Sequence, residues 1–264
     1  MKKWMVLVLL VFMSGCAITT VEYRYKQRFD HFYKLLNEEE KKAFCSDDFG
    51  RLAALLQKRM AEDTALSNEM DRVMFDEAIH TFRMDQVGMF FKRYILTGFH
   101  QDDYEKWVTM LPSGMLLKFA YQDSSLVKDV ESLVQKDGHF ASWWKKLATD
   151  GRLGDFSAEQ KIAFYRKYIF VERTQREVYS LAKFLSDYRL LGRFLRGDGD
   201  FGNRLDEVLK KDIVARRELK NLKMRAGLAK LSDGEFFAVY RDVVFKEMDQ
   251  EALAKTLAKF SVEK

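Results

Sequence analysis

The sequence predicts an all-α protein: a helical array of three units of similar size in solenoid-like order or, otherwise, an irregular helical bundle. The chain of 264 residues contains one proline and many Lys, Arg, Glu, Leu and Phe residues, which favours helix over sheet. No segment shows the sustained period-two alternation of apolar and polar residues that marks a half-buried strand. Similar windows recur along the chain at a nearly constant spacing, as in repeat proteins.

Helices are predicted from residue 21 onward. Val21, Tyr25, Phe29 and Phe32 follow one another in steps of three or four, which places them on one helix face. Later helix starts are indicated by capping boxes, in which two side chains three residues apart each bond the other's backbone amide. Four segments fit: Asn37-x-x-Glu40, Ser157-x-x-Gln160, Thr174-x-x-Glu177 and Ser232-x-x-Glu235. Breaks are predicted at turn-forming residues, namely Ser46-Asp47, Gly98, Pro112-Ser113-Gly114, Asp137-Gly138, Asp150-Gly151 and Gly197-Asp198-Gly199.

Three windows of the chain align without gaps: residues 82–101, 156–175 and 231–250. The first two share Phe82/Phe156, Gln86/Gln160, Phe90/Phe164, Tyr94/Tyr168, Ile95/Ile169 and Gln101/Gln175. The second and third share Ser157/Ser232, Ala163/Ala238, Tyr165/Tyr240, Arg166/Arg241, Phe170/Phe245, Glu172/Glu247 and Gln175/Gln250. The offsets are 74 and 75 residues. The windows therefore predict a three-unit repeat, with chance similarity between amphipathic helices as the alternative.

Further traces of the repeat lie outside these windows. Leu36-Asn37, Leu111-Pro112 and Leu185-Ser186 stand 75 and 74 residues apart and are predicted to mark comparable helix starts. Asp48-Phe49-Gly50 recurs as Asp200-Phe201-Gly202. If the repeat holds, each unit contains several helices that bury their apolar faces against neighbouring helices.

The first sixteen residues form a pattern of their own. Lys2 and Lys3 precede an apolar run over residues 4–13, and Ser14-Gly15-Cys16 follows it. A basic start, a short apolar run and small residues before a cleavage point describe an export signal. The segment resembles bacterial lipoprotein signals, whose lipobox is an aliphatic residue, two small residues and a cysteine. Met13 departs from that pattern by standing where leucine is usual.

The resemblance implies that residues 1–15 are removed and that Cys16 becomes a lipidated first residue. Ala17, which is not aspartate, implies the outer membrane facing the periplasm if the cell has two membranes. Residues 16–20 are then a lipidated cysteine and a short linker, of which the last four residues reach about 14 Å when extended, and residues 21–264 are a helical domain. An uncleaved N-terminal membrane anchor is the alternative, because residues 4–21 carry no charge.

Charge and cysteine content add little to this picture. The formal net charge is +5 and falls to +3 once Lys2 and Lys3 are removed, which is compatible with an anionic envelope surface without requiring one. With Cys16 lipidated, Cys45 has no intramolecular partner; a buried apolar thiol is expected, with an intermolecular bridge as the alternative.

No catalytic, metal or cofactor motif is recognised. Glu77 and His80 have the spacing of one di-iron ligand pair, but no second such pair follows, so neither a metal nor a cofactor is expected. The loop over 198–203 only faintly resembles a calcium loop, because Gly202 and Asn203 are interchanged and Leu209 replaces the bidentate glutamate. No catalytic residue is assigned.

Two surface features are candidates for binding. Residues 204–230 are rich in Lys and Arg beside an apolar stripe that Asp212 interrupts. Six of these basic residues are the candidate anionic-surface site: Arg204, Lys210, Lys211, Arg217, Lys220 and Lys223. An ordinary solvated helix face is the alternative. Trp143 and Trp144 point to different sides of a helix, so one is expected in the core and the other at an interface or partly exposed.

These features predict a membrane-anchored envelope lipoprotein that acts as a non-catalytic binding or scaffold module. Its expected partners are the membrane, through the lipid anchor, and an envelope protein or an anionic glycan or lipid; nucleic acid is not expected. The alternative is a lipid-anchored envelope hydrolase, for example one acting on peptidoglycan.

Overall fold

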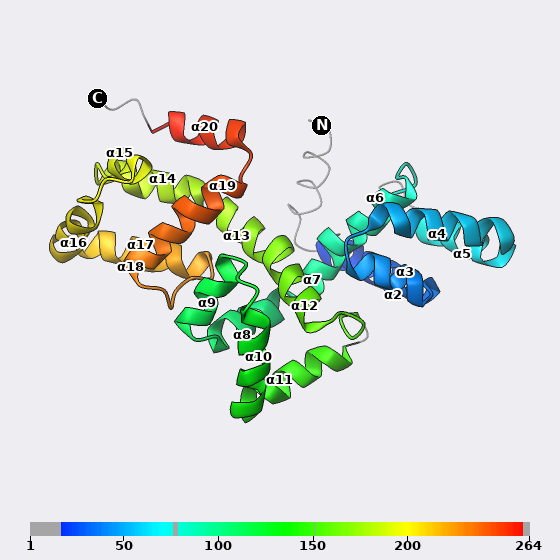
Figure 1. Ribbon diagram of the computed structural model, residues 1–264. Helices are drawn as coiled ribbons and strands as arrows, with labels where there is room; N and C mark the ends of the chain where they lie inside the picture. The colour runs from blue at the N-terminus through cyan, green and yellow to red at the C-terminus, as the bar shows by residue number, and fades with distance from the viewer. Residues whose placement is uncertain (1–16, 76–78, 151, 261–264) are drawn as a thin grey trace. The chain divides into compact units, whose positions relative to one another are not determined.

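The described part of the chain consists of helices and short connections (Figure 1). The computed structural model describes residues 17–75, 79–150 and 152–260, and within these ranges it contains no β-strand. The all-α prediction is confirmed. Contacts divide the chain into two compact units, Met1–His100 with Lys145–Gln160 and Gln101–Trp144 with Lys161–Lys264. The predicted helical domain over 21–264 is thus two units, which are described separately below.

The first unit is built around an aromatic core. Phe29, Phe32, Phe44 and Phe91 are fully buried, and the rings of Phe32 and Phe91 lie 4.9 Å apart. Its helices are α2 (Ala17–Leu35), α3 (Glu38–Cys45), α4 (Phe49–Glu62), α5 (Thr64–Met74), α6 (Met84–Phe90), the π-helix η1 (Phe91–Leu96) and α7 (Thr97–Phe99). Such aromatic pairs add attraction beyond the area that they bury.

The second unit has an equivalent core of its own. Trp107 stacks on Tyr165 at 5.4 Å and meets Phe119 edge-on at 4.6 Å, and all three side chains are fully buried. Its helices start with α8 (Gln101–Met110), α9 (Ser113–Ala120) and α10 (Leu126–Lys136). After η2 (Tyr165–Phe170) come α13 (Val171–Arg176), α14 (Val178–Asp187), α15 (Leu191–Arg196), α16 (Phe201–Lys211), α17 (Ile213–Arg225), α18 (Asp233–Val239), η3 (Tyr240–Val244), α19 (Phe245–Glu247) and α20 (Gln250–Ala258). Helices α11 (Gly138–Thr149) and α12 (Ala158–Phe164) contribute residues to both units.

The same order of elements occurs three times along the chain. A long helix, a shorter helix, a helical hairpin and a helix interrupted by a π-segment follow one another in each copy. The three copies are α2 to α7, α8 to α13 and α14 to α19. The π-segments begin at Phe91, Tyr165 and Tyr240, which are 74 and 75 residues apart. The three-unit repeat predicted from the aligned windows is therefore confirmed, and these copies are called the first, second and third repeat.

Backbone details repeat with the same spacing. The residue that ends the turn after the short helix has positive φ in all three repeats: Asp47 (60°), Gln122 (56°) and Gly197 (64°). The hairpin helices are joined each time by one aspartate, Asp63, Asp137 or Asp212, whose carboxylate accepts amide hydrogens from the start of the second helix. A one-residue connection allows little variation in geometry, because the N-cap bond fixes where the second helix starts.

Three predicted capping boxes are present, and one is not. Asn37, Ser157 and Ser232 each exchange hydrogen bonds with the residue three positions later. Thr174 instead lies inside α13, where its buried hydroxyl donates to the carbonyls of Phe170 and Val171. The prediction failed because a Thr in a helix interior satisfies its hydroxyl on the preceding turn.

Three boundary predictions also need correction. Helix α2 begins at Ala17, so residues 17–20 are a helical turn rather than an extended linker, and they rise about 6 Å instead of 14 Å. The break predicted at Gly98 lies two residues later, at His100, because Gly98 is still within α7. Ser186 lies in the last turn of α14 rather than at a helix start, because an extra turn at Tyr188-Arg189 delays α15 until Leu191.

Candidate functional site

The basic segment over 204–230 folds as a hairpin rather than as one helix. Helix α16 ends at Lys211, Asp212 forms the turn, and α17 runs from Ile213 to Arg225. Most of the predicted apolar stripe forms the buried side of this hairpin: Leu205, Ala215, Leu219 and Leu222 are buried, whereas Ala229 is exposed. Asp212 interrupts the stripe because it is the connection between the two helices.

Two of the six candidate basic residues form ion pairs with carboxylates of the second unit. Arg204 forms ion pairs with Asp200 and Glu207, both at 3.2 Å. Lys223 is 13% exposed and lies 2.6 Å from the carboxylate of Asp233. Arg204 thus pairs within its own helix and its N-cap, whereas Lys223 joins α17 to the start of α18.

The other four candidates are exposed: Lys210, Lys211, Arg217 and Lys220. Within the described part of the chain, none of the four has a hydrogen bond from its charged group or an ion pair within 4.0 Å. Their charges therefore face solvent and are not used to stabilise the fold. The structure thus reduces the six-residue candidate site to these four residues at the turn and on α17.

The outer face of α17 combines charge with exposed apolar side chains. Ile213, Arg217, Lys220 and Met224 follow one another in steps of four, three and four, which places them on one face, opposite the buried Ala215 and Leu219. We call these four residues the outer stripe. Ile213 is 64% exposed and Met224 is 49% exposed, and Val214 beside them is 55% exposed.

The carboxylate of Asp212 is turned into the fold. It accepts hydrogen bonds from the amides of Ala215 and Val214 and from the hydroxyl of Tyr188. The two amide bonds hold the pKa of Asp212 below its usual range, so the group stays ionised while it caps α17. The same environment acts on Tyr188, where burial and the bond to Asp212 raise the pKa to about 12.

A shallow groove of about 170 Å³ runs beside the outer stripe. Leu209, Leu219 and Met224 supply apolar surface to it, and Lys220 and Asp233 are among its polar lining residues. The groove is much smaller than the usual site of a small-molecule ligand. We therefore treat it as the flank of a binding surface rather than as an active site.

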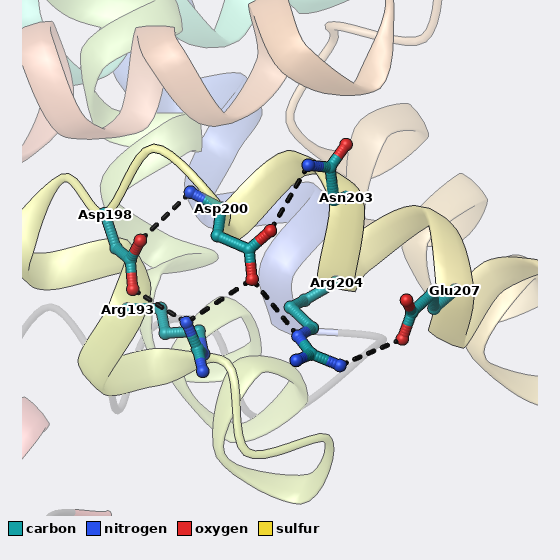
Figure 2. Close-up of polar contacts among 6 residues, drawn as sticks. All are labelled: Arg193, Asp198, Asp200, Asn203, Arg204 and Glu207. Carbon is teal, nitrogen blue, oxygen red and sulfur yellow. Dashed lines mark hydrogen bonds and ion pairs between the residues drawn. The ribbon is translucent and has the colours of Figure 1, made fainter.

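The loop that faintly resembles a calcium site is an ion-pair network (Figure 2). Asp198 accepts from the amide of Asp200 and pairs with Arg193 at 2.8 Å. Asp200 lies 3.7 Å from Arg193 and 3.2 Å from Arg204. The carboxylates thus face guanidinium groups, and no cluster of three metal-ligating side chains occurs among the described residues.

The Glu77/His80 pair, for which no metal was expected, is only partly covered by the described residues. His80 is exposed in a turn after α5, and Glu77 lies outside the described residues. Of the other histidines, His100 is buried and lies 3.9 Å from Asp150. Cys45 is buried, as expected, and forms no disulfide bond; its Sγ lies 3.9 Å from the hydroxyl of Tyr33. Trp143 is buried and Trp144 is half-buried, which matches the predicted division of that pair.

Two buried cations at equivalent positions were not recognised in the sequence. Lys92 in η1 donates to the carbonyls of Phe44 and Cys45 at 2.7 and 2.9 Å, at the end of α3. Arg166 in η2 donates twice to the carbonyl of Ala120, at 3.1 and 2.9 Å, at the end of α9. Favourable charges at a helix C-terminus are positive, so each cation fixes the short helix of its own repeat to the π-segment.

The third repeat lacks this clamp. Arg241 occupies the position equivalent to Lys92 and Arg166, but it is exposed and pairs with the adjacent Asp242 at 2.9 Å. The three aligned windows each carry a basic residue at this position. The alignment therefore indicates a repeated charge, but not whether the side chain is buried. Burial distinguishes the two structural cations from the exposed one.

The predicted lipid anchor is a feature separate from the surface on α16 and α17. Cys16 and the preceding signal are outside the described residues. None of the described helices is both long and apolar enough to pass through a bilayer. Comparison of the chain with protein family models, with curated proteins and with solved structures finds no match. The surface on α16 and α17 is thus defined by its geometry and charge alone.

Proposed function

We propose that this protein is a lipid-anchored helical repeat protein of the bacterial cell envelope and that it acts as a non-catalytic binding or scaffold module. The lipid is attached to Cys16, and the protein resides on the outer membrane facing the periplasm if the cell has two membranes. Its partners are the membrane and either an envelope protein or an anionic glycan or lipid.

The observation that carries this proposal is the lipobox pattern Ser14-Gly15-Cys16 directly before α2. Helix α2 begins at Ala17, the residue after the proposed lipidation site. An anchored cysteine would therefore hold the start of the first repeat at the lipid headgroups, without a long tether. Two or more acyl chains suffice for stable anchoring, since each buried methylene adds about 0.8 kcal/mol.

The described surface supports a binding role better than a catalytic one. A hydrolase of the envelope would use paired carboxylates, one of them held protonated by a raised pKa. At six described carboxyl groups, hydrogen bonds or ion pairs lower the pKa: Asp85, Asp123, Asp198, Asp212, Glu235 and Asp242. The hydrolase alternative gains no specific support from these residues.

The anchor is tested by replacing each cysteine in the full chain. Cys16→Ser is expected to leave an unprocessed precursor without lipid, whereas Cys45→Ser is expected to be processed and lipidated normally. Intact-mass spectrometry of the membrane fraction distinguishes these states. An unmodified Cys16 in the mature native protein would rule out the lipoprotein assignment.

The scaffold role is tested by cross-linking in intact cells followed by affinity purification. A stoichiometric envelope partner, together with an absence of peptidoglycan-cleaving activity in the purified protein, is the expected result. Release of muropeptides by the purified protein would instead favour the hydrolase alternative.

A further inference from the structure

We infer that the turn between α16 and α17, together with the outer stripe, is a docking surface for an anionic lipid bilayer and that Ile213 enters the headgroup layer. This inference deepens the proposed function by naming the partner of the module, and it rests on that function only for placing the protein near a membrane.

The first argument is the positive charge of side chains that form no ion pair within the described fold. Lys210 and Lys211 lie directly before the turn, and Arg217 and Lys220 lie on the outer stripe. All four are exposed, and Asp212, the acidic residue at the turn, has its carboxylate engaged with amides of the fold. A cluster of exposed cations is complementary to anionic headgroups, and each cation near such a surface strengthens binding about fivefold.

The second argument is the apolar tip between those cations. Ile213 and Val214 are the first residues of α17 and are 64% and 55% exposed. Large β-branched side chains at an exposed helix start are poor N-terminal residues and contribute little to the fold there. Two such side chains, with Lys210 and Lys211 before them and Arg217 after them, form a combination of apolar and basic residues by which peripheral proteins enter the boundary between headgroups and acyl chains.

The third argument comes from the other two repeats, which serve as internal references. The positions equivalent to Ile213 are Thr64 and Gly138, at the same one-residue turn. Those equivalent to Arg217 are Asn68 and Ser142. The turn geometry is thus kept in all three repeats, and the second repeat also carries Lys136 and Lys145 at the positions of Lys211 and Lys220, whereas the apolar tip of Ile213 and Val214 occurs only in the third repeat. Because the fold does not require these residues, their presence points to a surface function.

A bilayer fits this surface better than a folded partner or a small anion. Lys210, Lys211 and Arg217 flank the tip on α16 and α17 and lie outside the adjacent groove, whose volume of about 170 Å³ is small and which Lys220 lines. An extended anionic plane can meet charges from both helices at once. The exposed apolar tip distinguishes a bilayer from a soluble polyanion, which has no apolar layer for it to enter.

The experiment uses a soluble form comprising residues 17–264, which retains every described helix and lacks the proposed anchor. Binding is measured by co-sedimentation with vesicles of equimolar phosphatidylglycerol and phosphatidylcholine, and with vesicles of phosphatidylcholine alone. The parent should bind the anionic vesicles and release them as salt is raised. Polyglutamate serves as the soluble anionic competitor.

Three variants separate the contributions. Arg217→Gln with Lys220→Gln should weaken binding to anionic vesicles roughly 30-fold, as expected for two cations. Ile213→Ser should weaken it about fivefold at every salt concentration, because it removes an apolar and not an electrostatic term. Lys145→Gln with Lys146→Gln, an equal charge change on the equivalent helix α11, should have little effect. Circular dichroism confirms that each variant keeps its helix content.

Equal binding by the parent and the Arg217/Lys220 variant would overturn the inference, as would an equal loss in the α11 control. No effect of Ile213→Ser, or full displacement by polyglutamate, would show a general anion-binding face without insertion and would also overturn it. None of these results depends on Cys16, so failure here leaves the anchor proposal standing, and failure of the anchor leaves the vesicle result interpretable.

Discussion

Replacing Arg166 tests how the second repeat is held together. Its side chain is 6% exposed, donates twice to the Ala120 carbonyl and pairs with Glu247 at 2.5 Å. Methionine in its place keeps most of the apolar stem but removes all three interactions. Hydrogen bonds from a charged group to a buried acceptor contribute about 1.5 to 3 kcal/mol. With Glu247 left unpaired as well, we expect a loss of about 3 kcal/mol in the free energy of unfolding.

The tryptophans make this loss measurable. In residues 17–264 they are Trp107, Trp143 and Trp144, and all belong to the second unit. Urea unfolding followed by tryptophan fluorescence therefore reports on the unit that contains Arg166. With an m-value of about 2 kcal/mol/M, Arg166→Met should lower the urea midpoint by about 1.5 M.

Arg241 supplies the matched control for that experiment. It is the equivalent residue of the third repeat and also lies in the second unit, but its side chain is 47% exposed. Exposed ion pairs contribute about 0 to 1 kcal/mol, so Arg241→Met should shift the midpoint by no more than about 0.5 M. Equal shifts for the two variants would refute the reasoning that burial, rather than the repeated charge, makes the clamp.

Three further outcomes are expected. Lys92→Met should lower the free energy of unfolding of the first unit by about 2 to 4 kcal/mol, because the carbonyls of Phe44 and Cys45 lose their buried cation. Amide hydrogen exchange of the first unit measures this loss. Gly88→Ala should lower the melting temperature, because the new Cβ would lie 2.8 Å from the side chain of Leu52. Gly98→Ala should raise the melting temperature, because the new Cβ meets nothing within 4 Å and alanine favours the helix. Asp212→Asn should lower the melting temperature at neutral pH. Since the native pKa of Asp212 is depressed, its contribution is present above the unfolded pKa of about 3.9, and the difference should disappear as the pH falls through the native pKa.

Local rules explain what the sequence could predict. The capping boxes at Asn37, Ser157 and Ser232 depend on two side chains three residues apart, so their sequence pattern contains the whole interaction. The three aligned windows succeeded for a different reason. Each surrounds a π-segment in the same place, and the shared Phe90 and Phe164 place the same ring contacts on Tyr94 and Tyr168, at 5.6 and 5.7 Å.

Long-range contacts explain what could not be predicted. Lys92 and Phe44 are 48 residues apart, and Arg166 and Ala120 are 46 apart, so no local pattern shows that these cations are buried. The pattern of the basic segment does not indicate a hairpin, because Asp212 in a helical pattern resembles a polar interruption of one helix. The equivalent Asp63 and Asp137 were the available signal, since three aspartates at the repeat spacing indicate a repeated turn.

The third repeat differs from the first two in how its short helix α15 is held in place. Without a buried cation at position 241, the end of α15 is not clamped to its π-segment, and Leu195 at that end is 41% exposed. The ion-pair network of Arg193, Asp198 and Arg204 joins α15 to α16 instead (Figure 2). The outer stripe on α17 is separate from this network: Arg217 and Lys220 form no ion pair within the described residues, and Ile213 and Met224 are 64% and 49% exposed. Residues that the fold does not use are the physical condition for a binding surface on one copy of a repeat.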